Sequence, residues 1–473
     1  MSKTVAKYQR YAEYKESGIT WMGDVPKHWT SKRFKWLLTE KLKTSNSNLP
    51  AGSISFGEVI YKNEENLSPD TKGSYQEVLK DEFLINPLNL NYDLKSLRTA
   101  LSKIDVVVST GYIVLHCDQS LSRNYVRWLL QEFDVAHMKT LGAGVRQTVN
   151  FSDIANCYFY LPEQSEQTKI ANFLDHETAK IDSLIEKQQQ LIQLLKEKRQ
   201  AVISHAVTKG LNPDVPMKDS GVEWLGEVPE HWRVAPIKRI IHLMEQGKSP
   251  ECENIPATSE QWGVLKTSCV NNGIFHPQQN KALPKHTKPH TQYQVKAGDV
   301  LMSRASGSIN LIGSVALVPN NVQENLLLSD KIFRIHLTKD CDSRFFTLLM
   351  ATPYMRTLIE RAISGAEGMA NNITKTAILE FISAIPPLKE QMELVNHLTQ
   401  KIKAFDALIL KANEAIQLMQ ERRTALISAA VTGKIDVRNW QNPHTGLGTQ
   451  LNKAFKTAGL VNAGFTLPER PIE

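Results

Sequence analysis

Two stretches of 41 residues decide the fold of this chain, because neither contains a proline or a glycine. Residues 166–206 read EQTKIANFLDHETAKIDSLIEKQQQLIQLLKEKRQAVISHA, and residues 390–430 read EQMELVNHLTQKIKAFDALILKANEAIQLMQERRTALISAA. At 1.5 Å per residue each stretch predicts a helix of about 60 Å, which is too long for the interior of one compact domain. Both begin with Glu-Gln and end in similar residues at a constant offset of 224. They are therefore two copies of one helix.

Apolar residues recur along both stretches with spacings of three and four. A period of 3.5 predicts a left-handed coiled coil, and the natural partner of each helix is the other copy, in an antiparallel pair. The alternative is that each helix packs only on its own domain. Polar Gln188 and Lys198 fill two of the predicted seam positions in the first helix. The predicted coiled-coil residues are Ile181, Leu184, Leu191, Leu195, Val202, Phe405, Leu408, Met419 and Leu426.

A second repeat lies ahead of the helices. The segment KESGITWMGDVPKHW at 15–29 returns as KDSGVEWLGEVPEHW at 218–232, with nine of fifteen positions identical. Two repeats in the same order indicate a tandem duplication of the whole chain. We expect the tryptophans of both copies to be apolar anchors that pack each segment onto the start of the region that follows. These are Trp21, Trp29, Trp224 and Trp232.

The regions between the repeats differ in sequence and predict two mixed α/β domains, so the fold class is α+β. Short apolar runs bounded by turn residues indicate strands. Longer amphipathic runs predict helices over 124–133 and 344–363. The predicted strands are Phe83–Ile85, Val106–Val108, Val300–Met302 and Val315–Val318.

Composition bounds the class of protein. The 473 residues, 41% hydrophobic and 22% charged, predict two to four globular domains and exclude disordered and fibrous proteins. No run of about 18 apolar residues predicts a membrane span, and the first 14 residues lack a secretory signal. Five scattered cysteines fit reduced thiols in the cytosol. The net charge of +7 only mildly favours an anionic partner.

Catalytic motifs are missing from the sequence. Gly247-Lys248-Ser249 has His242 where a P-loop needs glycine, and Asn86-Pro87-Leu88-Asn89 lacks the second proline and the aromatic ring of an amino-methyltransferase. No Cys-x-x-Cys pair provides a zinc site. We therefore expect no catalytic residues, no metal ligands and no bound cofactor in this chain.

Binding residues are easier to find. Five lysines and no acid lie between Lys266 and Lys296, interleaved with amide side chains. Lysines attract phosphates, amides and arginines read base edges, and glycine-rich loops let a backbone approach a phosphate. A solvated loop face or a plain turn is the alternative reading. The candidate DNA-binding residues are Thr110, Tyr112, Lys139, Gly142, Gly144, Arg146, Gln147, Lys266, Lys281, Lys285, Lys288, Ser303, Arg304, Ser306, Gly368 and Asn371.

Taken together, the two repeated motifs and the two variable regions resemble the specificity subunit of a type I restriction–modification system. The resemblance covers about residues 8–438. It implies a conserved N-terminal segment at 1–29, a first recognition domain at 30–162 and a central helix at 163–210. A repeated tryptophan linker at 211–232, a second recognition domain at 233–386, a distal helix at 387–438 and a tail at 439–473 follow.

The resemblance also implies a function. Each recognition domain would read one half of a bipartite, asymmetric sequence in double-stranded DNA, and the paired helices would set the spacer. Two methyltransferase subunits and the restriction subunits would join this chain, and they would use S-adenosylmethionine, ATP and Mg²⁺. The chain would be a non-catalytic subunit in the bacterial cytoplasm. A helical scaffold that does not read DNA, and a divergent nuclease or methyltransferase, are the alternatives.

Overall fold

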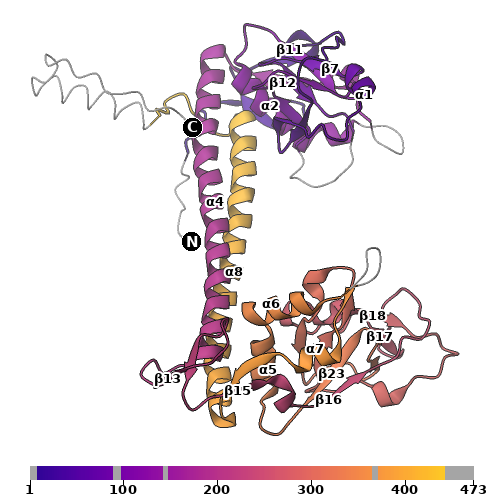
Figure 1. The fold of residues 1–473 in the computed structure, drawn as a ribbon. Helices are drawn as coiled ribbons and strands as arrows, with labels where there is room; N and C mark the ends of the chain where they lie inside the picture. The colour runs from indigo at the N-terminus through magenta and orange to yellow at the C-terminus, as the bar shows by residue number, and fades with distance from the viewer. Residues whose placement is uncertain (1–7, 89–96, 142–147, 365–370, 443–473) are drawn as a thin grey trace, which may run out of the picture. The chain divides into compact units, whose positions relative to one another are not determined.

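The computed structural model describes residues 8–88, 97–141, 148–364 and 371–442 (Figure 1). The chain divides into two compact units. Unit 1 combines the chain up to Lys187 with the part from Ala415 onward, and unit 2 contains Gln188–Glu414. Each unit holds one variable domain and one portion of each long helix.

The two long helices are confirmed. Helix α4 covers Gln164–Lys209 and helix α8 covers Leu388–Val431, which are 46 and 44 residues. A glycine with positive φ follows each helix within two residues, since Gly210 has φ 80° and Gly433 has φ 74°. Glycine adopts this left-handed conformation without a Cβ penalty, which is why it so often follows a helix.

The helices pair antiparallel. In unit 1 the guanidinium of Arg423 on α8 lies 2.9 Å from the carboxylate of Asp182 on α4. In unit 2, Arg199 on α4 lies 3.4 Å from Asp406 on α8. A step of 17 residues forward along α4 thus matches a step of 17 residues backward along α8. The antiparallel coiled coil of the predicted fold class is confirmed.

The predicted seam was wrong at three positions. Leu184, Leu191 and Leu408 are 51%, 43% and 51% exposed. Their C-terminal neighbours Ile185, Ile192 and Ile409 are half-buried instead. After Ile181 and Phe405, the next seam residue lies four positions further along the helix, not three. Each error falls where two apolar residues are adjacent, so the sequence fits either spacing. Ile181 and Leu426 are buried, whereas Leu195, Val202, Phe405 and Met419 are half-buried, as seam positions require.

The variable domain of unit 1 is built on an antiparallel sheet in the order β4-β11-β8-β9. Helix α2 (Arg123–Ala136) contributes Tyr125, Leu129 and Phe133 to the core on this sheet. The sheet strands are β4 (Leu38–Glu40), β8 (Phe83–Ile85), β9 (Thr99–Leu101) and β11 (Ile113–Cys117). Shorter pairs involve β1 (Tyr14–Glu16), β2 (Asp24–Pro26), β3 (Thr30–Arg33), β5 (Gly52–Ser55), β6 (Glu58–Tyr61), β7 (Gln76–Val78), β10 (Val106–Val108) and β12 (Tyr158–Leu161). Short helices are α1 (Pro69–Gly73) and α3 (Phe151–Ala155).

The variable domain of unit 2 repeats this sheet despite its different sequence. Its order is β16-β23-β19-β21, formed by β16 (Ile241–Gln246), β23 (Ile332–Leu337), β19 (Val300–Ser303) and β21 (Val315–Leu317). An added sheet joins β17 (Gly263–Leu265) to β18 (Asn280–Ala282) and to β22 (Leu326–Leu327). The other strands are β13 (Met217–Asp219), β14 (Glu227–Pro229), β15 (Arg233–Pro236), β20 (Ala305–Ser306), β24 (Asn371–Asn372) and β25 (Ile382–Ile385). All four predicted strands are confirmed.

One predicted helix is wrong. Residues 344–363 form two helices, α5 (Ser343–Met350) and α6 (Pro353–Ala362), and α7 (Lys375–Leu379) follows later. Pro353 lacks the N–H that a continuous helix would use and takes the first position of α6, where no such bond is needed. The predicted helix over 124–133 is confirmed as the central part of α2.

Three properties of the described residues bear on function. None of the helices they form is both long and apolar enough to cross a membrane. All five cysteines are free thiols. Within the same ranges no three His, Cys, Asp or Glu side chains gather as metal ligands would. Whether the chain binds a cofactor stays a prediction.

Candidate nucleic-acid interface

The repeated tryptophan motif binds the repeated Glu at the start of each long helix. In unit 1 the indole Nε1 of Trp29 donates to Glu166 at 3.0 Å, and His28 Nε2 lies 2.8 Å from the same carboxylate. In unit 2 Trp232 and His231 make the same contacts with Glu390, at 3.0 and 2.8 Å. In each unit, the tryptophan motif and the start of the long helix therefore bind each other. We call this contact the junction of the unit.

The far end of the other long helix completes each junction. Lys434, just after α8, donates through Nζ to the backbone of Met22 at 3.1 Å. Lys209, at the end of α4, donates in the same way to Leu225 at 3.3 Å. Each variable domain is therefore held between the start of one helix and the end of the other.

The predicted role of the tryptophans holds for only some of them. Trp29 and Trp232 are buried anchors, but Trp224 is 45% exposed and is not an anchor, which corrects the prediction. The buried pair packs on the helix starts as well as on the variable domains. The indole N–H of a buried tryptophan usually has a hydrogen-bond acceptor, and here Glu166 or Glu390 provides it.

The junction in unit 1 is the more enclosed of the two. The hydroxyl of Tyr11 donates to Glu166 at 2.6 Å, and Arg438 lies over the Tyr11 ring at 5.0 Å. Burial, followed by the bond to Glu166 and the charge of that carboxylate, raises the pKa of Tyr11 well above its usual value. The phenol therefore stays protonated and remains a donor.

Unpaired leucines lie on the exposed side of both long helices. Leu184 and Leu408 are each 51% exposed, and Leu194 and Leu418 are 62% and 64% exposed. Both pairs are separated by the repeat offset of 224. The two helix copies thus expose the same apolar residues. We refer to these four side chains as the repeated leucines.

In unit 1, two of the candidate DNA-binding residues, Thr110 and Tyr112, lie at the turn between β10 and β11. Thr110 is exposed and Tyr112 is half-buried. Lys43 donates to the carbonyl of Thr110 at 2.9 Å, and Gln76 donates to that of Tyr112 at 2.7 Å. Lys43 is a cation at this turn that the sequence did not indicate, since it lies 67 residues from Thr110.

Several candidates in the glycine-rich loops cannot be placed. Gly142, Gly144, Arg146, Gln147 and Gly368 lie outside the described residues. Lys139 belongs to a 3-10 turn at Met138–Thr140, and its side chain lies outside the described part of the structure. Their role in DNA binding stays a prediction.

In unit 2, the structure brings three candidates together. Ala305–Ser306 pairs with Asn371–Asn372, with Ser306 opposite Asn371. Arg304 is half-buried, donates to the carbonyl of Asp330 at 3.3 Å and lies over the Phe333 ring at 6.0 Å. Residues far apart in the sequence therefore form one polar edge.

Ser303 does not belong to that edge. Its side chain is fully buried, donates to the carbonyl of Leu311 and accepts from the backbone N–H of Ser314 at 3.2 Å. A hydroxyl used in this way closes a turn of the fold. The prediction that Ser303 binds DNA was wrong.

The basic run divides between a pocket and a loop. Lys285 and Lys288 are exposed in the loop after β18. Lys266, which follows β17, and Lys281, within β18, line a pocket of about 530 Å³. The other polar residues of this pocket lie outside the basic run, so the sequence did not indicate them. Ser249 precedes the run, and Ser329, Asp330 and Lys331 follow Lys281 by more than 45 residues. We call it the lysine pocket, and its polar lining includes Ser249, Lys266, Lys281, Ser329, Asp330 and Lys331.

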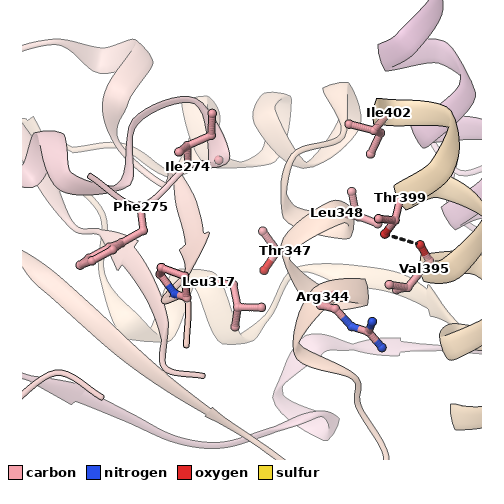
Figure 2. Close-up of a pocket in the computed structure, with 11 residues that line it drawn as sticks. Ile274, Phe275, Leu317, Arg344, Thr347, Leu348, Val395, Thr399 and Ile402 are labelled. Carbon is pink, nitrogen blue, oxygen red and sulfur yellow. Dashed lines mark hydrogen bonds between the residues drawn. The ribbon is translucent and has the colours of Figure 1, made fainter. Parts of the chain in front are cut away.

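A second pocket in unit 2, of about 360 Å³, has a different character. Figure 2 shows Ile274 and Phe275 on one side and Thr347, Leu348 and Ile402 on the other. The only charged residue in its described lining is Arg344. The guanidinium of Arg344 is already paired with Asp342 at 3.0 Å, so this pocket offers a phosphate no unpaired cation.

Comparison with known proteins agrees with this architecture. The family model for the type I restriction modification DNA specificity domain matches residues 95–194 and 229–418. The EcoEI specificity subunit of Escherichia coli is 30% identical over 51% of this chain and 40% of its own length. The EcoKI specificity subunit of Escherichia coli strain K12 is 24% identical over 74% of this chain and 70% of its own.

One solved structure supports the fold alone. A chain from a structure on complex assembly and conformational transition of the type I R-M system superposes with a TM-score of 0.58 at 14% identity. The superposition covers 87% of this chain and 99% of the solved chain. The alignment with the EcoEI subunit spans only about two fifths of that relative.

Proposed function

The chain belongs to the type I restriction–modification DNA specificity family, and we propose that it is the DNA-recognition subunit of such a system. The observation that carries the proposal is the repetition of one sheet order, β4-β11-β8-β9 and β16-β23-β19-β21, on two halves of an antiparallel helix pair. Two readers on one scaffold suit a bipartite target in double-stranded DNA. Because the loops on the two sheets differ, the two half-sites differ as well.

The repeated leucines support a pair of identical partners. An exposed leucine at the same position of each helix copy offers the same apolar contact twice, and such residues gain about 1.5–3 kcal/mol each when buried. We assign these contacts to two methyltransferase subunits, with restriction subunits completing the complex. The methyl transfer to adenine, and the base flipping it needs, would then fall to the partners.

The chain itself would be non-catalytic and would bind no cofactor. S-adenosylmethionine, ATP and Mg²⁺ would belong to the partner subunits. The complex would work in the bacterial cytoplasm, where free thiols such as the five cysteines are kept reduced.

Exchange of the second variable domain tests the proposal directly. Replacing residues 233–386 with the corresponding domain of another specificity subunit should change one half of the methylated sequence and leave the other half unchanged. Each half-site depends on contacts made by one domain. Methylation sequencing of a host that carries the system gives the motif before and after the exchange. A motif altered in both halves, or in neither, would contradict separate reading by two domains.

The helix pair should set the spacer between the half-sites. Inserting seven residues into both α4 and α8 keeps the seam in register and adds about 10.5 Å of helix. At about 3.4 Å per base pair this corresponds to roughly three further base pairs of spacer. We expect the recovered motif to keep both half-sites and to lengthen between them. An insertion of seven residues in α4 alone makes this helix one heptad longer than α8, so that their ends no longer match; this variant is the control and should abolish methylation.

A further inference from the structure

The lysine pocket has the chemistry of an anion site, and its construction starts with the pairing of β17 and β18 (Figure 1). Val264 on β17 is opposite Lys281 on β18. Because side chains alternate along a strand, Lys266 projects on the same side as Val264. Lys266 and Lys281 are therefore diagonal neighbours on one face of the sheet.

The third strand brings a hydroxyl to the same place. β22 runs parallel to β17 with Val264 opposite Leu327, and Ser329, two residues after β22, lines the same pocket as Lys266. The Gly247–Ser249 segment crosses here, since the backbone N–H of Gly247 donates to Ser329 at 3.2 Å. A Cβ on Gly247 would lie 1.8 Å from the carbonyl oxygen of Leu328, so only glycine permits this crossing. The Gly247-Lys248-Ser249 sequence, which does not match a P-loop, thus contributes Ser249 to the lining of the pocket.

The two lysines carry unpaired charges. Within the described part of the chain, no carboxylate oxygen lies within 4.0 Å of the Nζ of Lys266 or Lys281. Lys331, by contrast, is paired with Asp330 at 2.9 Å. Ammonium groups that share a concave site without a counter-ion attract an anion more strongly than the same charges spread over a convex surface.

Ser329 supplies an independent indication of a ligand. Its side chain is only 3% exposed, and its Oγ has no hydrogen-bond partner among the described residues. Burial of a hydroxyl without a hydrogen-bond partner is unfavourable, so such groups are uncommon unless something binds them. Since Ser329 lines the lysine pocket, an anion held there would accept its O–H.

The carboxylate of Asp330 does not oppose an anion in this place. It accepts a hydrogen bond from the Ser249 hydroxyl and is paired with Lys331. Partial burial acts to raise its pKa, but these two partners and Arg304 lower it overall. Asp330 is thus an ionised group whose charge Lys331 offsets, and it orients Ser249 and Lys331 at the rim. Glu251, which also lines the pocket, is exposed to solvent.

We propose that the lysine pocket holds one backbone phosphate of the DNA half-site bound by the variable domain of unit 2, with Lys266 and Lys281 neutralising it and Ser329 donating a hydrogen bond. The inference rests on the proposed function and adds a position and a role to it. The pocket fixes the domain on the DNA strand, and sequence reading belongs to other residues. The loss of a phosphate contact weakens binding equally for every DNA sequence.

The test uses the complex of the full chain with its methyltransferase subunits. Binding is measured over a range of salt concentrations to two duplexes, one with the methylated motif and one with the same bases in scrambled order. The double variant Lys266→Gln with Lys281→Gln should bind both duplexes about tenfold more weakly. The slope of log affinity against log salt should fall by about 0.9, the value for one neutralised phosphate. Ser329→Ala should lower the affinity for both duplexes by a smaller, equal factor.

Lys339→Gln is the matched control, because Lys339 is exposed in the same domain and does not line the pocket. Equal thermal midpoints for all variants establish that they fold. An unchanged salt slope in the double variant, or a loss confined to the motif duplex, would overturn the inference, the latter by showing that the lysines read bases. A further contrary result is that inorganic phosphate stabilises the wild-type complex but not the double variant, while both bind DNA equally well. That result would overturn the inference, because the pocket would then bind a free anion and not a DNA phosphate. A wild-type complex that does not prefer the motif would instead overturn the proposed function.

Discussion

The Glu166→Ala variant should lower the stability of unit 1 by about 3 kcal/mol. Glu166 accepts hydrogen bonds from Trp29 at 3.0 Å and from Tyr11 at 2.6 Å, and both donors are buried. Removing the carboxylate leaves two buried donors without an acceptor, and each such donor costs about 1–3 kcal/mol. For a unit of this size the midpoint of thermal unfolding should fall by roughly 6–12 °C.

The chain contains its own control for this prediction. Glu390 occupies the same position in unit 2, but its side chain is 27% exposed, compared with 6% for Glu166. Glu390→Ala should therefore cost only about 1 kcal/mol. Because the chain has two compact units, hydrogen exchange resolved to peptides of each unit is the suitable measurement. Equal losses from the two substitutions would contradict the view that the enclosed junction matters more.

The second large effect concerns assembly. Replacing Leu184 and Leu408 with aspartate should weaken binding of the proposed methyltransferase partners at least about a hundredfold. Each change removes an apolar contact and leaves a carboxylate that the interface would have to desolvate. Sedimentation or light scattering of the purified chain mixed with its partner subunits gives the loss of the assembled complex.

Ile185→Asp separates assembly from folding. Ile185 is the neighbour of Leu184, but it packs on the core of unit 1. This variant should destabilise the helix pair by about 2–4 kcal/mol, whereas Leu184→Asp should leave the unfolding midpoint almost unchanged. If Leu184→Asp were the more destabilising of the two, the seam would follow the spacing first predicted and the repeated leucines would not be a free surface.

Local patterns predicted the elements well. The absence of proline and glycine over 41 residues predicted α4 and α8, and short apolar runs predicted β8, β10, β19 and β21. These predictions succeed because hydrophobic periodicity and helix-breaking residues act within a few positions of the chain. The break between α5 and α6 was missed, although Pro353 was visible in the sequence.

The seam of the helix pair shows where such patterns become ambiguous. Leu184-Ile185, Leu191-Ile192 and Leu408-Ile409 place two apolar residues side by side, so spacings of three and of four fit equally well. Only the partner helix distinguishes them, because burial depends on which side chain meets the opposite surface.

The candidate interface was less predictable than the fold. Lys266 and Lys281 stood out as members of an acid-free run, yet Asp330 and Lys331 carried no local pattern and Ser249 was noted only in a failed P-loop match. Ser303 looked like its neighbours Arg304 and Ser306 but is fully buried. Adjacent residues of a strand point to opposite faces, so sequence proximity does not establish a shared surface.

The sequence by itself determined that this protein is a tandem duplication with two long helices, because repeats and periodicity are properties of the chain. Only the tertiary structure decided which tryptophans anchor each half, which leucines remain exposed and which lysines share a pocket. Each of these depends on contacts between residues tens to hundreds of positions apart. Such contacts form when the sheets and helices pack, and no spacing along the chain encodes them.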